Sequence, residues 1–336
     1  MKDSKKLFSD FKKTVIIFLI GYILIEAYLW YLETNEGFVE PYEWGNRNDI
    51  PYKISECSKL FAEKENRDKI KIIIIGDSGP ESGFNPELLD TLFDKKTISY
   101  NLGFYATGVR VQSLIVNEII IPKLKPDIVI WDLSVPNDFE DSKKVNNQEN
   151  TTLNHFGARY YSGNTDGLDF EQKCDFYFFK FSRLYRYRQT LMPNIFGLNE
   201  KVVGLNELYG RLYDRGWLKH KGSLIIDNNQ TTKEEVCNVE LNKESRDLFF
   251  ETIKNLEKKT EYFFIINKPF YKIKIVCPTI YSFYNKLSPK NFLDLNGKEE
   301  LYFPEIWMNV GHLNEYGANY YTHYIYEKIS QNYQIE

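Results

Sequence analysis

Short apolar runs alternate with helical periodicity over much of the chain. The clearest is the run of four isoleucines at 72–75, which is closed by Gly76 and predicts a strand at 69–75. A β-branched, fully apolar run of this length is typical of a strand buried on both faces of a parallel sheet. The same reasoning predicts strands at 98–102 and 127–133, with helices at 86–93 and 108–120 between them. This alternation indicates an α/β fold with a parallel sheet and right-handed crossovers.

The α/β rhythm stops in the middle of the chain and then returns. Residues 139–242 are polar and tyrosine-rich. Because so long a segment is rarely structureless in a compact domain, we expect an insertion with helices of its own that caps the sheet edge. The later pattern predicts helices at 243–259 and 315–331 and strands at 262–266, 273–276 and 292–295.

The N-terminal region contains the longest apolar run, residues 14–32. As a helix it would span roughly 28 Å, close to the ~30 Å hydrocarbon core of a bilayer. Tyr28, Trp30 and Tyr31 stand at its far end, as residues of an interfacial belt do. A cleavable signal peptide would have small residues there, so we interpret the run as an uncleaved anchor.

Flanking charges set the direction of this anchor. Lysines precede it and glutamates follow it, so the N-terminus is expected in the cytoplasm and the rest of the chain outside. The predicted division is a cytoplasmic basic tail at 1–13, a transmembrane anchor at 14–32, a stalk at 33–68 and a domain at 69–336. Glu26 lies inside the apolar run; we interpret it as a protonated or snorkelling carboxyl, with contact to a partner membrane protein as the alternative.

Composition excludes some functional classes. The net charge of −4 and the pI near 5.8 give no reason to expect nucleic acid as a partner. The four cysteines are scattered without a CxxC spacing, which argues against a zinc or redox motif; they are Cys57, Cys174, Cys237 and Cys277. In an oxidising compartment they could pair, but the sequence does not give the connectivity.

Two short segments carry candidate chemistry. Ser78 follows the first predicted strand, at the edge where open α/β sheets place their ligands. His312 lies near the C-terminus and supplies a base that such a serine would need. A hydroxyl nucleophile and a histidine base are the minimal parts of serine acyl transfer, which requires no metal and no cofactor.

These segments belong to four blocks that occur in a familiar order. The blocks are Gly76-Asp77-Ser78, Asn101-Leu102-Gly103, Val135-Pro136-Asn137-Asp138 and Asn309-Val310-Gly311-His312. Together they resemble the SGNH hydrolase superfamily, also called GDSL-type esterases, over residues 72–320. The surroundings of Ser78 and His312 look most like membrane-anchored members linked to polysaccharide O-acylation.

The resemblance implies a three-layer α/β/α sandwich with a mostly parallel sheet. It also implies that Ser78 is the nucleophile and His312 the base. Gly103 would give a backbone N–H and Asn137 a side-chain amide to the oxyanion, beside the N–H of Ser78. Asp77 is a possible supporting residue that bonds the N–H groups of the turn.

The last block departs from the pattern at Asn309, where the family has the carboxylate partner of the histidine. In a serine protease, the Asp-to-Asn change lowers kcat about 10⁴-fold. An asparagine oxygen can still accept the ring N–H, as in Cys-His-Asn proteases. Asp294 is a second candidate that could replace the missing carboxylate in space. The third block also departs, with Val135 in place of glycine.

The sequence therefore predicts a membrane-anchored, extracytoplasmic serine O-acyl (acetyl) transferase or esterase. Its expected substrate is a polysaccharide or other envelope glycan. Hydrolysis of lipid or small esters is a second enzymatic interpretation. Because of Asn309, a third is a catalytically impaired fold that binds glycan or acts as a scaffold partner of a membrane acyltransferase.

Overall fold

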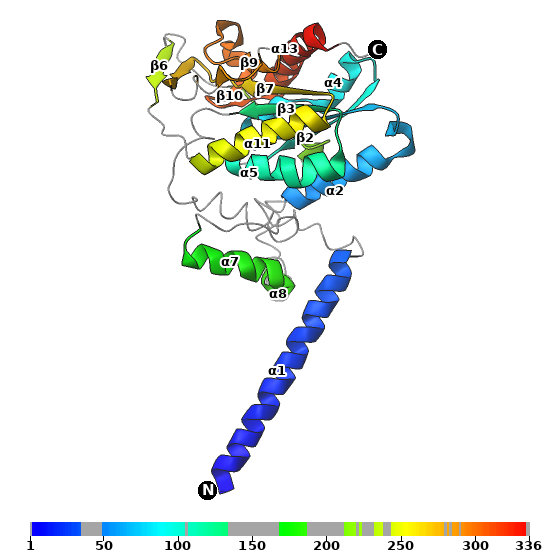
Figure 1. Ribbon diagram of the computed structural model, residues 1–336, viewed down its shortest axis with the longest axis vertical. Coiled ribbons are helices and arrows are strands. Elements are labelled where there is room, and N and C mark those ends of the chain that lie inside the picture. Colours follow the sequence, from blue (N-terminus) through cyan, green and yellow to red (C-terminus); the bar gives the residue numbers. More distant parts are fainter. Residues whose placement is uncertain are drawn as a thin grey trace.

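A five-stranded parallel sheet forms the centre of the domain (Figure 1). The computed structural model describes residues 2–34, 49–104, 107–133, 168–186, 212–219, 222–223, 232–237, 243–278, 281, 284–288 and 290–333. The strand order is β2-β1-β3-β7-β9. The bounds are β1 Ile70–Gly76, β2 Thr97–Gly103, β3 Ile128–Leu133, β7 Tyr262–Asn267 and β9 Phe292–Asp294. The α/β class and these predicted strands are confirmed.

Each face of the sheet packs into its own hydrophobic cluster. Ile73 and Ile75 of β1 point to one cluster, while Ile72 and Ile74 point to the other. The first cluster is covered by α2 (Asp49–Ala62), α5 (Val109–Ile115) and α11 (Lys243–Lys259). The second is covered by α4 (Pro86–Leu92) and α13 (Glu315–Asn332). Because both faces are covered, the strands are continuous apolar runs rather than alternating ones.

The second half of the predicted stalk at 33–68 is instead the helix α2. Ile54, Cys57 and Phe61, on one face of α2, are buried in the first cluster, so the second half of the segment 33–68 belongs to the folded domain. Pro51 suggested an irregular stalk, but it lies in the first turn of α2, where a helix tolerates proline. Residues 35–48 lie outside the described part.

The N-terminal helix α1 (Lys2–Thr34) projects away from the domain (Figure 1). Its segment Asp10–Tyr31 is long and apolar enough to cross a membrane, and it contains nearly all of the predicted anchor. Most of its apolar side chains are exposed. An apolar helix that the rest of the chain leaves exposed is a candidate for a membrane span.

The predicted insertion at 139–242 contains helices, but part of it is joined to the main fold. Its described elements are α7 (Phe170–Phe181), α8 (Arg183–Arg186), β4 (Leu212–Asp214), β5 (Trp217–Leu218) and β6 (Lys233–Val236). Strand β6 pairs in parallel with β8 (Ile273–Val276). The β4–β5 hairpin binds β2, where the Asn101 N–H donates to the Arg215 carbonyl at 2.9 Å.

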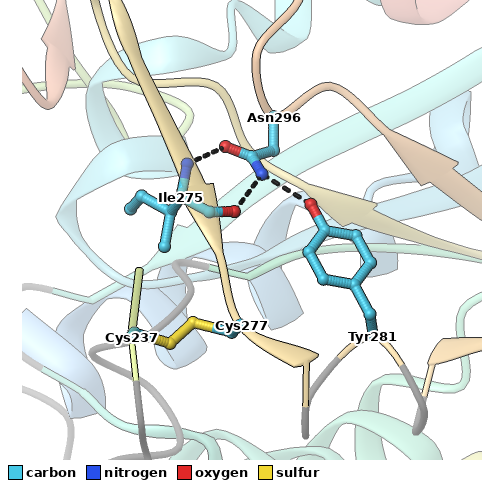
Figure 2. The surroundings of a disulfide bond; sticks show 5 residues. All are labelled: Cys237, Ile275, Cys277, Tyr281 and Asn296. Atoms are coloured by element: carbon cyan, nitrogen blue, oxygen red, sulfur yellow. Dashed lines mark hydrogen bonds between the residues drawn. A yellow bond between two sulfur atoms is a disulfide. The ribbon is translucent and has the colours of Figure 1, made fainter. Parts of the chain in front are cut away.

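One disulfide joins two parts of the chain that are far apart in sequence (Figure 2). Cys237 follows β6, Cys277 follows β8, and the two Cα atoms are 4.9 Å apart. Asn296 secures β8 beside the bridge, because its side chain bonds both the N–H and the carbonyl of Ile275, at 2.8 and 2.5 Å. Cys57 and Cys174 are not disulfide-bonded.

Candidate active site

The register of the sheet gathers three chain segments at one point of its carboxyl edge. Gly76, the last residue of β1, pairs with Gly103 of β2 and with Asp132 of β3. The chain passes from β1 to β2 on one side of β1 and then returns to β3 on its other side. The direction of the connections therefore reverses at β1, which makes it a topological switch point. Such a point is where open α/β sheets bind ligands.

A tight strand-to-helix turn presents Ser78 at this edge. Gly76 has a φ of +156°, and a Cβ there would overlap the Asp132 carbonyl oxygen, so the turn requires glycine. Asp77 caps the short helix α3 (Ser78–Gly83) by accepting the Gly79 N–H at 2.7 Å. Ser78 is therefore held as the first residue of α3.

A hairpin near the C-terminus brings the histidine to this serine. It consists of β10 (Trp307–Asn309) and β11 (His312–Leu313). Asn314 caps the following helix α13 and donates to the Glu305 carbonyl at 2.6 Å. Gly317 lies so close to Ile306 that a Cβ would overlap its carbonyl oxygen. These contacts fix the hairpin against the start of α13.

Ser78, His312 and Asn309 form a hydrogen-bonded chain. Ser78 Oγ is 2.8 Å from His312 Nε2, and His312 Nδ1 is 2.9 Å from Asn309 Oδ1. The same oxygen accepts the backbone N–H groups of Gly311 and His312, at 2.9 and 3.0 Å. Two N–H donors must face an oxygen, so they fix the orientation of the amide.

The amide orientation determines the tautomer of the histidine. Because an oxygen faces Nδ1, this nitrogen carries the proton and donates it to Asn309. The lone pair of Nε2 then points at the hydroxyl of Ser78, which is the arrangement that a general base requires. The neutral asparagine thus supplies the orienting part of a triad acid, without its charge.

Asp294 does not take the place of the missing carboxylate. Its Oδ1 accepts hydrogen bonds from the Asn267 side chain at 2.8 Å and from the Asn296 N–H at 3.1 Å. These bonds connect the ends of β7 and β9. The residue that the structure places against His312 Nδ1 is therefore Asn309.

The structure does not show either predicted oxyanion donor, Gly103 or Asn137, as a free donor in the described part of the chain. The Gly103 N–H donates to Asn101 Oδ1 at 2.9 Å, so it is already paired within its own strand. To bind an oxyanion it would have to leave that partner. Asn137 and Asp138 lie outside the described residues.

A lysine that the sequence reasoning missed lies next to the serine turn. Lys268 directly follows β7, and its Nζ is 3.3 Å from both carboxylate oxygens of Asp77. Its side chain is only 7% exposed. The signal was its position after a predicted strand, at the edge that also holds Ser78.

A buried carboxyl group lies behind the same turn. Asp132 is 1% exposed, and its Oδ2 accepts a hydrogen bond from the Tyr321 hydroxyl at 3.1 Å. Burial raises the pKa of Asp132 to about 8; the Lys268 charge lowers this pKa and the Asp77 charge raises it. The group can therefore carry a proton at neutral pH.

Besides the pair Lys268–Asp77, a second buried charge pair holds α3. Lys53 of α2 is 2.8 Å from Glu81 Oε1 and 2.6 Å from the Gly103 carbonyl. The side chains of Lys53 and Glu81 are 0% and 5% exposed. Sequence reasoning missed Lys53 because it was assigned to the stalk. The pair joins α2 to the helix that begins with Ser78.

Comparisons of the chain with models of protein families, with curated proteins and with solved structures find no match.

Proposed function

We propose that the chain is a serine acyltransferase or esterase with an SGNH-like three-layer α/β/α domain. The observation that carries the proposal is the hydrogen-bonded chain Ser78–His312–Asn309, with 2.8 and 2.9 Å between the bonded atoms. A hydroxyl, a base of the correct tautomer and an orienting group in this order are the parts of a serine nucleophile. Their position at the switch point of the sheet supports the same conclusion.

In the proposed reaction, Ser78 Oγ attacks the carbonyl carbon of an ester while its proton passes to His312 Nε2. The C=O electron pair moves to the oxygen, which the Ser78 N–H stabilises, with Asn137 as the second proposed donor. The tetrahedral intermediate collapses, and the leaving alkoxide takes the proton from His312. Water or a sugar hydroxyl then attacks the acyl-serine while His312 takes its proton; the bond between the acyl carbon and Ser78 Oγ breaks, and Oγ takes the proton back from His312.

An extracytoplasmic glycan is the proposed acyl acceptor or ester substrate. Three features support this choice: the candidate span in α1, the disulfide between Cys237 and Cys277, and the resemblance to polysaccharide O-acylation proteins. A disulfide is typical of an oxidising compartment. With the span as an anchor, the domain would act on polymers at the outer surface of the membrane.

The test is covalent labelling of the full-length chain in detergent with a fluorophosphonate, which reacts with activated serines. We expect labelling at Ser78, loss of labelling in Ser78→Ala, and a strong reduction in His312→Gln. Ser330→Ala is the control, because this hydroxyl bonds only the local Glu327 carbonyl among the described contacts. Labelling that survives in Ser78→Ala would contradict the proposal.

The neutral Asn309 favours one alternative, a domain that binds glycan or acts as a scaffold for a membrane acyltransferase. In that case neither the natural chain nor Asn309→Asp would react with the probe or hydrolyse p-nitrophenyl acetate. Both proteins would still bind envelope glycan in a pull-down. Labelling of the natural chain excludes the alternative.

A further inference from the structure

One face of α7 carries an exposed stripe of aromatic side chains. Phe170, Tyr177, Phe178 and Phe181 are 84%, 47%, 57% and 71% exposed. Because successive helical residues are about 100° apart, positions i, i+7, i+8 and i+11 fall within an arc of about 100°. The four rings therefore form one continuous stripe, which is called the aromatic stripe below.

The other face of α7 is already partnered. Phe176 and Phe179 are 1% and 7% exposed, and Phe176 belongs to the hydrophobic cluster on the α2 side of the sheet. Phe176 therefore joins α7 to the domain, Phe179 packs on Tyr185 of α8, and the aromatic stripe lies on the other face. An exposed apolar patch of this kind marks an interaction surface.

The junction of α7 and α8 is bonded to α1 inside the apolar segment. The Glu26 carboxylate accepts the Ser182 hydroxyl at 2.5 Å and the N–H groups of Arg183 and Leu184 at 2.8 and 3.1 Å. The Tyr22 hydroxyl also donates to Ser182, at 3.0 Å. The acidic residue inside the predicted anchor thus has its partner in the same chain.

The position of Glu26 along α1 gives a depth for this contact. Glu26 precedes Tyr31, the end of the apolar segment, by five residues, which is about 7.5 Å along a helix. Helices that lie in a membrane interface bury their apolar face by about 5–10 Å. Figure 1 shows α7 below the domain, beside the upper end of α1 and not parallel to it. Lys173 and Lys180 border one edge of the stripe, as basic residues do on interfacial helices, and Glu171 borders the other edge.

We propose that α7 is a second membrane contact, with the aromatic stripe inserted into the interfacial region of the outer leaflet. The bilayer is the occupant because Glu26 ties the junction of α7 and α8 to α1 inside the candidate span, which places the aromatic stripe near the membrane surface. The consequence is a fixed orientation of the domain on the membrane, instead of free rotation on a tether. The proposal rests on α1 as the span and not on the acyl chemistry.

The test places an environment-sensitive fluorophore on the stripe of the full-length chain in phospholipid vesicles. Phe178→Cys is labelled in a Cys174→Ser background, in which the remaining thiol, Cys57, is buried. We expect a blue-shifted emission and quenching by lipids that carry a nitroxide near the headgroup. Glu87→Cys, on the exposed surface of α4, is the control and should be quenched only by an aqueous quencher.

Two further variants test the cause. Phe170→Ser with Phe181→Ser should reduce the lipid quenching at position 178, and so should Glu26→Ala, because the tie to α1 is lost. Fluorophosphonate labelling of Ser78 reports the proposed function separately. Resistance to alkaline extraction reports insertion of α1. If the chain resists extraction while the position 178 label behaves like the Glu87 control, the bilayer is not the occupant and the proposal is wrong.

Discussion

At the scale of single residues, Asn309 decides how strong the proposed base can be. Its Oδ1 already accepts three hydrogen bonds from Gly311 and His312, so an aspartate oxygen would fit without rearrangement. The carboxylate would add a charge-assisted bond, about twice as strong as a neutral one, to the imidazolium formed in the reaction.

We therefore expect Asn309→Asp to raise kcat/KM for p-nitrophenyl acetate by about tenfold, equivalent to about 1.4 kcal/mol in the barrier. The measurement is ester hydrolysis by full-length protein in detergent. Asn309→Ala is the matched control and should lose most of the activity, because nothing then fixes the tautomer of His312. Equal rates for the natural chain, the aspartate and the alanine would show that position 309 does not orient the base.

Asp132 predicts a pH dependence of stability. Its pKa is about 8 in the folded chain because of burial, whereas an unfolded aspartate titrates near about 3.9. Between these values the folded state holds a proton that the unfolded state has released. The free energy of unfolding therefore decreases as the pH rises, by at most about 1.4 kcal/mol per pH unit from this group.

Asp132→Asn should remove this decrease, because the amide does not titrate. Urea unfolding at intervals between pH 5 and 8 would show a flatter profile for the variant than for the natural chain. Tyr321→Phe is the matched control. It removes the hydrogen bond to Oδ2 but leaves the carboxyl group that titrates, so the decrease with pH should remain. If Asp132→Asn keeps the slope of the natural chain, another group causes it.

At the scale of elements, the contact between α2 and α3 depends on a buried ion pair. Removing one partner of such a pair costs about 3–5 kcal/mol, because the other charge stays buried and uncompensated. We expect this loss of unfolding free energy for Lys53→Met, and a smaller loss when Glu81→Gln is added. Urea denaturation in detergent measures both.

The same helix offers a matched control. Lys59 and Glu56 of α2 form an ion pair at 3.0 Å whose side chains are 49% and 36% exposed. Solvent screens such a pair, so Lys59→Met should change the stability by less than about 1 kcal/mol. If Lys53→Met costs no more than Lys59→Met, the buried pair does not hold α3 in place.

These elements also show which features the sequence could predict. Strands such as β1 were predictable because a short β-branched run closed by glycine is typical of a strand buried on both faces. The helix α2 was missed because Pro51 has the same local signal in a helical first turn as in a stalk. Lys53 and Lys268 were missed because their partners are distant in sequence, and polar contacts of this kind leave no periodic pattern. Ser78 and His312 were found from short motifs, and their distance came only from the structure.

At the scale of the whole molecule, three features bear on where the domain lies relative to the membrane. The candidate span lies in α1, and α7 is the proposed second membrane contact. The disulfide joins Cys237, which follows β6, to Cys277, which follows β8. Because a disulfide is typical of an oxidising compartment, it supports the proposal that the domain lies outside the cytoplasm.

The disulfide gives a prediction that tests this orientation in cells. Quenching whole cells with acid and then alkylating the unfolded chain should modify Cys57 and Cys174 at once, but Cys237 and Cys277 only after reduction. If all four thiols are alkylated without reduction, the bond is not formed where the protein resides, and the extracytoplasmic proposal fails.

A bridge between residues 40 apart in sequence stabilises the folded state by about 4 kcal/mol in the chain-entropy model. Cys237→Ser with Cys277→Ser should therefore lower Tm, whereas Cys174→Ser should leave it nearly unchanged, because that thiol is not bonded in a disulfide.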